Sequence, residues 1–377
     1  MAEVYLHGTG IIPFGRYPDR TLEQLAVPAA WDALAASAAS STDIDAVYCG
    51  NVYGGMLPAQ RIAAGLGLTG RPAYNVEAAC SSSAVALHLA VGAIRAGELD
   101  TALVIGVEQL SVFGGGTLRL NATDPDVAQG LTMPAVYAMR AQRYLRATGA
   151  TVEDLAAVSV KNHANGALNP NAQFRRLTPL DEVLKSRPIA DPLTLLQCCG
   201  SGDGAAAVVV SRHRPDARTW PRAVQVAASV VDSGTVGAHD MTREDLTTRV
   251  AGQAYAAAGI GPQDLGVIEL HDAFTIAELL YYEALGLCGY GEAPGLLREG
   301  VTERSGRHPV NAGGGLLSRG HPLGATGIAQ VVEVAGHLRG STTTLEHRPS
   351  VGLTHCTGGG ISGYDHAVCS VHVLAVN

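Results

Sequence analysis

The chain has 377 residues, and a hydrophobic share of 47% with 16% charged residues is typical of a globular protein and excludes a disordered one. The net charge is −8 and the basic residues are scattered, so we expect no nucleic-acid partner. The seven cysteines include no paired CxxC, which predicts a cytoplasmic protein without disulfides or a zinc site. No apolar stretch approaches roughly 18 residues, so no membrane span is expected.

The first part of the chain alternates short apolar runs with longer Ala-rich segments, which predicts a layered α/β fold. An apolar run ends at a polar loop in 41–51, a helix is expected at 82–97, and a strand at 101–109. Cys80 precedes that helix, where free backbone N-H groups and the helix dipole favour a thiolate. Cys80 is therefore a candidate nucleophile; the alternative is a small buried cysteine that only packs.

Residues 112–195 have a different character, with a GGG run, a predicted helix at 133–149 and a polar stretch at 161–179 that is expected to form a loop. Long loops inside a compact protein are usually functional. We interpret this region as an insertion that forms a lid over the site.

The second half of the chain repeats features of the first. The run 262–272 has the pattern of 41–51, and a Gly-rich loop opens a second Ala-rich helix at 325–340. We interpret this as a twofold duplication, whose strand-end loops meet at one crevice. The expected parts are a first half at 1–111 that is completed at 196–240, the insertion at 112–195, and a second half at 241–377.

His321 stands between glycines in GGGLLSRGHPLGATG (313–327), and Pro322 narrows the freedom of the loop. A histidine held in this way can take the proton of a thiol and then donate to a developing oxyanion. The alternative is a phosphate-binding Gly loop, but the spacing matches neither GxGxxG nor GxxxxGK[ST].

HCTGGGISG (355–363) offers Cys356 as a general base for a carbon acid, followed by glycines whose N-H groups can bind an oxyanion. A plain Gly-rich turn is the alternative. His271 and Asp272 stand at the end of a predicted strand, and Asp272 is equally well explained as the N-cap of the next helix. No i, i+3 or i, i+4 pair of ligands is present, so no metal is expected.

The order of Cys80, HDAF (271–274), GHPLGATG (320–327) and CTGGG (356–360) resembles the thiolase family. It is most similar to the sterol carrier protein type, in which His replaces the Asn of the NEAF motif of better-known thiolases. The resemblance spans nearly the whole chain, including SGDGAAAVVVS at 201–211. It implies a five-layer α-β-α-β-α body of two like halves with an inserted loop domain, assembled as a homodimer or a dimer of dimers.

The resemblance also implies roles for the candidate residues. Cys80 would accept the acyl group, with His321 as its activator and Cys356 as the acid/base at the carbon next to the thioester. His271 would join His321 in binding the thioester oxygen, while the backbone N-H groups of Cys80 and Gly358 would hold the acyl oxygen. Met133 would line the substrate pocket; a plain core position is the alternative.

The activity that the resemblance implies is acyl transfer between a 3-ketoacyl-CoA and CoA, or the reverse Claisen condensation, with acyl-CoA and CoA as partners and no tightly bound cofactor. Three alternatives keep the same fold: a ketoacyl synthase, another acyltransferase, or a sterol side-chain aldolase that works with a small acyl-CoA-binding partner. A non-catalytic thiolase-like subunit is a fourth. The second cysteine, Cys356, favours the thiolase.

Some residues are left with two interpretations. His163 either faces the channel for the pantetheine arm or is solvated, and Arg175 and Arg176 either meet a phosphate of the coenzyme or coat the surface. Cys198 and Cys199 are interpreted as packing residues. Three further cysteines match nothing catalytic: Cys49, Cys288 and Cys369.

Overall fold

A computed structural model describes residues 2–37, 39–114, 116–118, 120, 122–218, 220–237, 239–342, 345–360 and 366–376. The strands are β1 (Tyr5–Ile11), β2 (Ala46–Gly50), β3 (Ala73–Val76), β4 (Thr101–Gln109), β5 (Pro188–Ala190), β6 (Leu193–Thr194), β7 (Asp203–Ser211), β8 (Val224–Ser233), β9 (Val267–Glu269), β10 (Val351–Gly358) and β11 (Val368–Val376). The helices of the two halves are α1 (Leu22–Ser37), α2 (Pro58–Gly65), α3 (Ser82–Ala96), α8 (Asp245–Ala258), α9 (Thr275–Ala284), α10 (Ala293–Arg298), α11 (Gly315–Arg319) and α12 (Leu323–Arg339).

Nine strands form one sheet in the order β3-β2-β4-β7-β1-β8-β11-β10-β9. The junction of β1 and β8, which pair over only two residues, divides the sheet into five strands of the first half and four of the second. In the first half β2 and β4 are parallel and β4 and β7 antiparallel; in the second half β9 and β10 are parallel and β10 and β11 antiparallel. This repeated topology confirms the predicted two like halves.

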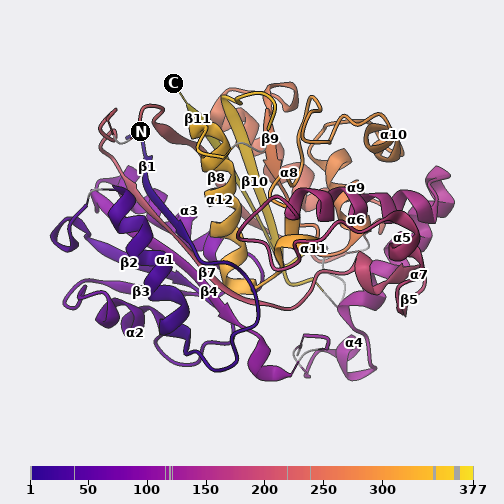
Figure 1. Ribbon diagram of the computed structural model, residues 1–377, viewed down its shortest axis with the longest axis horizontal. Coiled ribbons are helices and arrows are strands. Elements are labelled where there is room, and N and C mark those ends of the chain that lie inside the picture. Colours follow the sequence, from indigo (N-terminus) through magenta and orange to yellow (C-terminus); the bar gives the residue numbers. More distant parts are fainter. Residues whose placement is uncertain are drawn as a thin grey trace.

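The two halves of the sheet enclose a central helical layer made by α3 and α12 (Figure 1). Ala86, Ala90 and Ala329 in these helices are fully buried, because small side chains allow helices to approach strands closely. Helix α1 covers the outer face of the first half, and α8 covers that of the second. The result is the predicted five-layer α-β-α-β-α arrangement.

The window 79–96, which includes α3, is long and apolar enough to cross a membrane by length and composition. Half of that window is buried inside the fold, as expected for a core helix. This differs from the expectation that no stretch would reach that length, and the difference arises because α3 is buried between two sheets and needs apolar residues on more than one face.

The insertion contains α4 (Pro125–Ala128), α5 (Met133–Thr148), α6 (Val152–Gly166) and α7 (Leu180–Lys185), with β5 and β6 as a small separate pair. The helix expected at 133–149 is present as α5. The stretch 161–179 is not all loop, because residues 161–166 complete α6. Its asparagines are buried there and donate to backbone and carboxylate groups, so their polarity does not signal exposure.

Candidate active site

Cys80 lies partly buried in the turn between β3 and α3. The preceding residue, Ala79, has a φ of 48°, a left-handed conformation that is uncommon for residues with a Cβ and concentrates at functional sites. Ser82 stabilises the turn: its Oγ accepts from the amide of Ala78 at 3.0 Å, and its hydroxyl donates to the carbonyl of Ala79 at 2.6 Å. Cys80 is therefore held at the entrance of α3.

His321 lies between α11 and α12, and its ring Nδ1 is 2.7 Å from Oγ1 of Thr326. The Thr326 hydroxyl itself donates to the carbonyl of Pro322 at 3.1 Å. The Thr326 hydroxyl has one proton, which it gives to this hydrogen bond. Its oxygen therefore accepts the hydrogen bond from Nδ1-H of His321, and Nε2 of His321 keeps a lone pair. Within the described part of the chain this buried Nε2 has no hydrogen-bond partner. It is available to accept a proton.

The structure brings together the four side chains that the sequence singled out. Sγ of Cys80 and one ring nitrogen each of His271 and His321 lie within 4.8 Å of one another. The two imidazole rings stand nearly perpendicular, with centroids 5.0 Å apart. The sulfur of Cys356 lies 3.3 Å from Nδ1 of His271 and 3.2 Å from the carbonyl oxygen of Cys80. Two thiols and two imidazoles thus surround one point.

Parallel strand pairing explains why segments so distant in sequence meet here. β2 pairs in parallel with β3, and the Cys80 turn follows β3. β9 pairs in parallel with β10, with Glu269 opposite Thr354, so His271 and Cys356 leave neighbouring strands at the same edge. The carboxyl ends of parallel strands are the usual place for a ligand in α/β sheets.

Gly358 allows β10 to pass close to the Cys80 turn. A Cβ at this position would lie 2.3 Å from the carbonyl oxygen of Ala78 and 3.1 Å from the amide nitrogen of Ser81. Because a side-chain carbon cannot approach backbone atoms that closely, only glycine fits. The segments expected to supply the two oxyanion-binding amides, those of Cys80 and Gly358, therefore lie side by side.

Burial sets the protonation states of the site. It raises the pKa of the Cys80 thiol to about 12 and that of Cys356 well above its usual value. It lowers the pKa of His321 to about 3, with the positive charge of Arg319 as a second cause, and that of His271 well below its ordinary value. At neutral pH the thiols keep their protons and the imidazoles are neutral. Burial thus outweighs the helix end that was expected to favour a thiolate, so a base must take the proton of Cys80.

Cys80, His271 and His321 could also hold a metal ion by distance alone, since thiolate and imidazole are zinc ligands. A thiol beside two imidazoles that serve proton transfer and oxyanion binding has the same geometry as such a metal site, so distance alone does not distinguish the two. The prediction that no metal is needed therefore stays a prediction.

A cavity of about 510 Å³ opens on Cys80 and extends beneath the insertion. Part of its wall is apolar and includes Met133, Tyr137 and Phe274. The rings of Tyr137 and Phe274 stack with centroids 4.4 Å apart. The cavity leads to the partly buried sulfur of Cys80, and Met133 lies at its wall. The contact of Met133 with a substrate stays a prediction.

Residues 4–214 match the thiolase N-terminal domain, and residues 227–370 match the thiolase C-terminal domain-like family. The chain belongs to the thiolase family. It is 42% identical to benzoylsuccinyl-CoA thiolase subunit BbsB of Thauera aromatica, over 98% of each chain, and 38% identical to an acetyl-CoA acetyltransferase of Methanothermobacter thermautotrophicus, over 95% of this chain and 97% of that one. It is 34% identical to sterol carrier protein 2 of Gallus gallus, over 89% of this chain and 66% of that one. These relatives confirm the predicted family and make this thiolase an acyltransferase.

Solved structures agree with this assignment. The Ltp2-ChsH2(DUF35) aldolase superposes with a TM-score of 0.86 at 26% identity, covering 100% of this chain and 98% of that one. Human mitochondrial 3-ketoacyl-CoA thiolase in complex with CoA superposes with a TM-score of 0.76 at 18% identity, over 100% and 98% of the two chains. The second match shows the fold alone. Thiolases use CoA as a substrate, so the cavity of this thiolase has to admit CoA.

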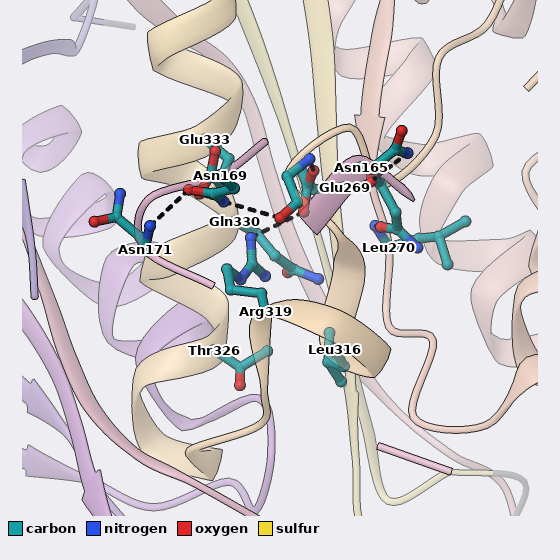
Figure 2. A network of polar contacts seen from close by, with 12 residues as sticks. Asn165, Asn169, Asn171, Glu269, Leu270, Leu316, Arg319, Thr326, Gln330 and Glu333 are labelled. Atoms are coloured by element: carbon teal, nitrogen blue, oxygen red, sulfur yellow. Dashed lines mark hydrogen bonds and ion pairs between the residues drawn. The ribbon is translucent and has the colours of Figure 1, made fainter. Parts of the chain in front are cut away.

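The loop that carries the candidate base of this thiolase rests on a buried polar network (Figure 2). Nη1 of Arg319 lies 2.9 Å from Oε2 of Glu269, whose Oε1 accepts from the amide of Gly313 at 2.9 Å. Asn169 donates to Glu333 at 2.7 Å and to the carbonyl of Gly313 at 2.8 Å. The network ties the loop to β9, to α12 and to the insertion, and sequence reasoning missed it because its members are far apart in the chain.

Asp272 is not the N-cap of α9, which begins at Thr275 after Phe274. Its carboxylate instead accepts from the amides of Leu316 and Leu317 at 2.7 and 3.3 Å, and from Asn162 at 2.8 Å. It therefore caps the start of α11, a helix more than 40 residues away, and fixes the segment that leads to the candidate base.

Glu108, at the end of β4, is a second residue that sequence reasoning missed. Its buried carboxylate accepts from the amides of Val52, Tyr53 and Gly324 at 3.0, 3.2 and 3.3 Å. Burial raises its pKa to about 7. Glu108 joins the loop after β2 to the entrance of α12, and only the three-dimensional structure reveals this because these three donors are backbone groups.

Both interpretations of His163 are wrong. The residue is buried in α6, 6.4 Å from Phe174 between ring centroids, and it does not line the cavity among the described residues. Burial lowers its pKa to about 4. Arg176 pairs with Glu182 on the surface, and Arg175 is exposed and is not among the residues that line the cavity. A contact of either arginine with a phosphate of the coenzyme stays a prediction.

Cys198 and Cys199 pack against the core of the second half, as predicted, but they also line the cavity. The amide of Cys199 donates to the carbonyl of Ala273 at 2.9 Å. This contact joins the cavity wall to the HDAF segment. Cys198 and Cys199 therefore pack against the core and also form part of the cavity wall.

Proposed function

We propose that this thiolase transfers an acyl group between a 3-oxoacyl-CoA and CoA through a thioester on Cys80, and that it also runs the reverse Claisen condensation. The observation that supports this most is the convergence of Cys80, His321, Cys356 and His271 at the buried part of one cavity. An acyl carrier, its base, an acid for carbon and a pair of oxyanion donors are the groups that the reaction needs.

In the first half-reaction, Nε2 of His321 takes the proton of Cys80, and the thiolate attacks the 3-oxo carbon. The amides of Cys80 and Gly358 hold the resulting oxyanion. Cleavage of the bond between C2 and C3 leaves the acyl group on sulfur and releases the enolate of acetyl-CoA. The imidazoles of His271 and His321 donate hydrogen bonds to the enolate oxygen, and Cys356 gives its proton to C2.

In the second half-reaction, CoA enters with its thiol proton and the thiolate of Cys356 removes it. The sulfur of CoA attacks the acyl carbon on Cys80, and the same two amides hold the second tetrahedral oxyanion. When the carbon-sulfur bond to Cys80 breaks, Nε2 of His321 returns its proton to the Cys80 sulfur, and the enzyme is again in its starting state with both thiols protonated. The starting state matches the raised pKa values of the two cysteines.

Thiolysis of acetoacetyl-CoA and of longer 3-oxoacyl-CoA substrates by the purified chain tests the proposal. Loss of the 3-oxoacyl-CoA absorbance should depend on added CoA, and intact-mass analysis of quenched samples should find the acyl group on Cys80. Absence of thiolysis at every chain length, with Cys80 shown to be unmodified, would contradict the proposal.

The match to the Ltp2-ChsH2(DUF35) aldolase favours a second candidate, a retro-aldol reaction carried out with a small acyl-CoA-binding partner. The relative from Thauera aromatica is itself named as a subunit. The two thiols together support thiolysis, because Cys80 can carry the acyl group while Cys356 serves the proton at C2, and a retro-aldol cleavage needs no acyl transfer to sulfur. Release of a free aldehyde or ketone without consumption of CoA would identify the second candidate.

We also propose that the chain forms a homodimer through the edge at β3. β3 ends the sheet, and an unpaired edge strand is normally covered. Apolar side chains on and around this edge are unusually exposed: Met56 at 82%, Leu57 at 54%, Tyr74 at 48% and Leu89 at 46%. Light scattering should give twice the chain mass of 38.8 kDa. A monomer in the wild type at micromolar concentration would contradict the dimer.

The proposed location is a reducing cytoplasm. All seven cysteines are free thiols in the structure, and thiols persist where glutathione and thioredoxin keep them reduced. A catalytic cycle that depends on two thiols requires such a compartment.

A further inference from the structure

The opening of the cavity of this thiolase carries two exposed arginines. Arg16 and Arg187 contribute to the cavity wall together with Cys80, and both are exposed, so they lie where the cavity meets solvent. Among the described residues that line the cavity, these two have a permanent positive charge, and none is an aspartate or a glutamate. The opening therefore offers an anion two guanidinium groups.

Neither guanidinium group is occupied by the protein itself. Within the described part of the chain, Arg16 and Arg187 form no ion pair and no side-chain hydrogen bond. Other exposed arginines do so, as Arg212 does with Asp100 at 2.9 Å. A guanidinium presents five N-H donors in a planar fork that matches the oxygens of a phosphate. Arg16 and Arg187 keep this capacity for a ligand.

The backbone on both sides of Arg16 is tied to Asp203, the first residue of β7. Gly15 and Asp203 exchange two backbone hydrogen bonds, at 3.0 and 2.7 Å. The amide of Tyr17 donates to the carboxylate of Asp203 at 2.6 Å, and Asp203 is fully buried. The side chain of Arg16 therefore starts from a fixed point of the first half.

Arg187 belongs to the insertion and stands directly before β5. Its carbonyl accepts from the amide of Leu195 at 2.8 Å, and the next residue, Pro188, pairs with Thr194 in the small sheet of β5 and β6. The hydroxyl of Thr194 donates to the carbonyl of Val183 at 2.8 Å, which joins this sheet to α7. The two positive charges thus reach the same cavity from separate, well-anchored parts of the fold.

The nucleotide end of CoA has the chemistry that suits these charges. A thioester that reacts at Cys80 extends along the cavity through its pantetheine arm, and beyond the arm CoA carries a diphosphate and a 3′-phosphate. Such groups are too polar for the apolar wall around Met133 and Phe274. The chain as a whole has a net charge of −8, which repels an anion, so local positive charge is required to hold the phosphates.

We propose that Arg16 and Arg187 form a phosphate subsite at the opening of the cavity, which selects CoA and its thioesters over pantetheine and its thioesters. The proposal rests on the proposed thiolase function and assigns the part of the substrate that the catalytic residues do not touch. Hydrogen bonds from guanidinium to phosphate are charge-assisted. Because both arginines are exposed, each contact contributes modestly, and added salt should weaken it.

The test measures, by calorimetry, the dissociation constants of CoA and pantetheine, which share the thiol arm and differ by the nucleotide. The wild type should bind CoA at least about 10-fold more tightly than pantetheine. Arg16→Gln and Arg187→Gln should each weaken the binding of CoA by about 3- to 10-fold, and the double variant by about 10-fold or more. The dissociation constant of pantetheine should change by less than about 2-fold, because it has no phosphate to lose.

Dephospho-CoA, which lacks the 3′-phosphate, identifies the phosphate that the arginines hold. If they hold the 3′-phosphate, dephospho-CoA should bind the wild type as weakly as CoA binds the double variant, and the substitutions should not weaken it further. If they hold the diphosphate, both substitutions should weaken dephospho-CoA as they weaken CoA.

Kinetics test the same subsite during the reaction. In the two arginine variants, kcat/KM for acetoacetyl-CoA should fall in parallel with the affinity for CoA, with the change in KM rather than kcat. The value for acetoacetyl-pantetheine should stay the same. Arg146→Gln is the matched control, because Arg146 is exposed in the last turn of α5 and is not among the described residues that line the cavity. It should leave all values unchanged.

Melting curves check that each variant folds, and Arg187→Met, which keeps most of the apolar stem, replaces Arg187→Gln if that variant does not. Equal losses for CoA and pantetheine would overturn the subsite, because the substitutions would then disturb the cavity itself. No loss for CoA in the double variant, or a wild type that binds pantetheine as tightly as CoA, would overturn it as well. A wild type whose affinity for CoA depends on both arginines but that performs no thiolysis is a separate outcome, which removes the proposed function and leaves the subsite.

Discussion

The sulfur of Cys356 lies 3.3 Å from Nδ1 of His271, deep in the cavity wall. Burial raises the pKa of the thiol and lowers that of the imidazole, so the proton rests on sulfur at neutral pH. A protonated thiol next to a neutral imidazole can give its proton to a carbanion, and the neighbouring ring can stabilise the thiolate that remains. Cys356 is therefore suited to give a proton to carbon, whereas Cys80 must lose its proton to act as a nucleophile.

We predict that Cys356→Ala will still accept an acyl group on Cys80 from acetyl-CoA, because the nucleophile, its base and the oxyanion amides remain. Thiolysis of acetoacetyl-CoA should fall by about 10²- to 10⁴-fold, the usual contribution of a general acid or base. Intact-mass analysis measures the first effect and steady-state kinetics the second. Cys369→Ala, on β11, is the control. Turnover of Cys356→Ala at the wild-type rate would refute its assigned role.

A second prediction concerns Thr326, which receives the hydrogen bond from Nδ1-H of His321. Thr326→Val keeps the shape of the side chain but removes this acceptor, so the ring loses the contact that fixes its tautomer. We expect kcat/KM for thiolysis to fall by about 10- to 100-fold, and Thr326→Ser to restore most of it. If valine and serine at this position behave alike, the hydrogen bond does not orient the base.

The fold could be predicted from the sequence because its signals are local or repeated. The apolar run that forms β4 and the Ala-rich segments that form α3 and α12 have the periodicity of their elements, and both halves show the same order. Cys80, His321 and Cys356 could be found for a related reason, since each stands in a Gly-rich or small-residue segment next to a regular element. Such segments are where a backbone can approach a ligand.

The supporting residues could not be predicted in this way. Asp272 caps a helix more than 40 residues further along, and Glu108 binds backbone amides of two distant segments. Their main-chain partners leave no side-chain pattern in the sequence, and their side-chain partners, Asn162 and Asn51, lie far away in the chain. The helical part of 161–179 was missed because buried polar side chains look the same as exposed ones in a one-dimensional pattern.

A third prediction uses the close approach of β10 to the Cys80 turn. Gly358→Ala places a carbon 2.3 Å from the carbonyl oxygen of Ala78, so the strand and the turn must move apart and the two oxyanion amides with them. Removing one such donor costs roughly 3 kcal/mol in the transition state, and we expect kcat to fall by about 100-fold or more.

The matched control for this prediction is Gly92→Ala in α3, where an added carbon meets nothing within 4 Å. Alanine favours a helix interior over glycine by about 1 kcal/mol, so this variant should be as stable as the wild type or more stable, with full activity. Full activity of Gly358→Ala would show that the two amides do not act together on one oxygen.

The fourth prediction concerns acid stability. Six buried histidines have lowered pKa values, and three buried carboxyl groups have raised ones: His163, His271, His321, His337, His355 and His372, against Glu108, Asp272 and Glu333. A histidine that is neutral in the folded state binds its proton only on unfolding, so below pH 6.5 the unfolded chain gains protons and stability falls. The raised carboxyl groups act in the opposite direction, because the folded state binds their protons first; for Glu108 and Glu333 this applies between about pH 7 and 4.5.

The histidines outnumber the carboxyl groups, so the free energy of unfolding should decrease as the pH falls from 6.5 toward 4.5. Each uncompensated proton is worth on the order of 1.4 kcal/mol per pH unit. Melting temperatures measured at steps across this range should drop steadily, while values between pH 7 and 8 should change little. His372→Gln, which removes a buried histidine of β11 away from the cavity, should flatten the acid part of the curve. A melting temperature that stays constant down to pH 4.5 would mean that these histidines are not held neutral in the folded protein.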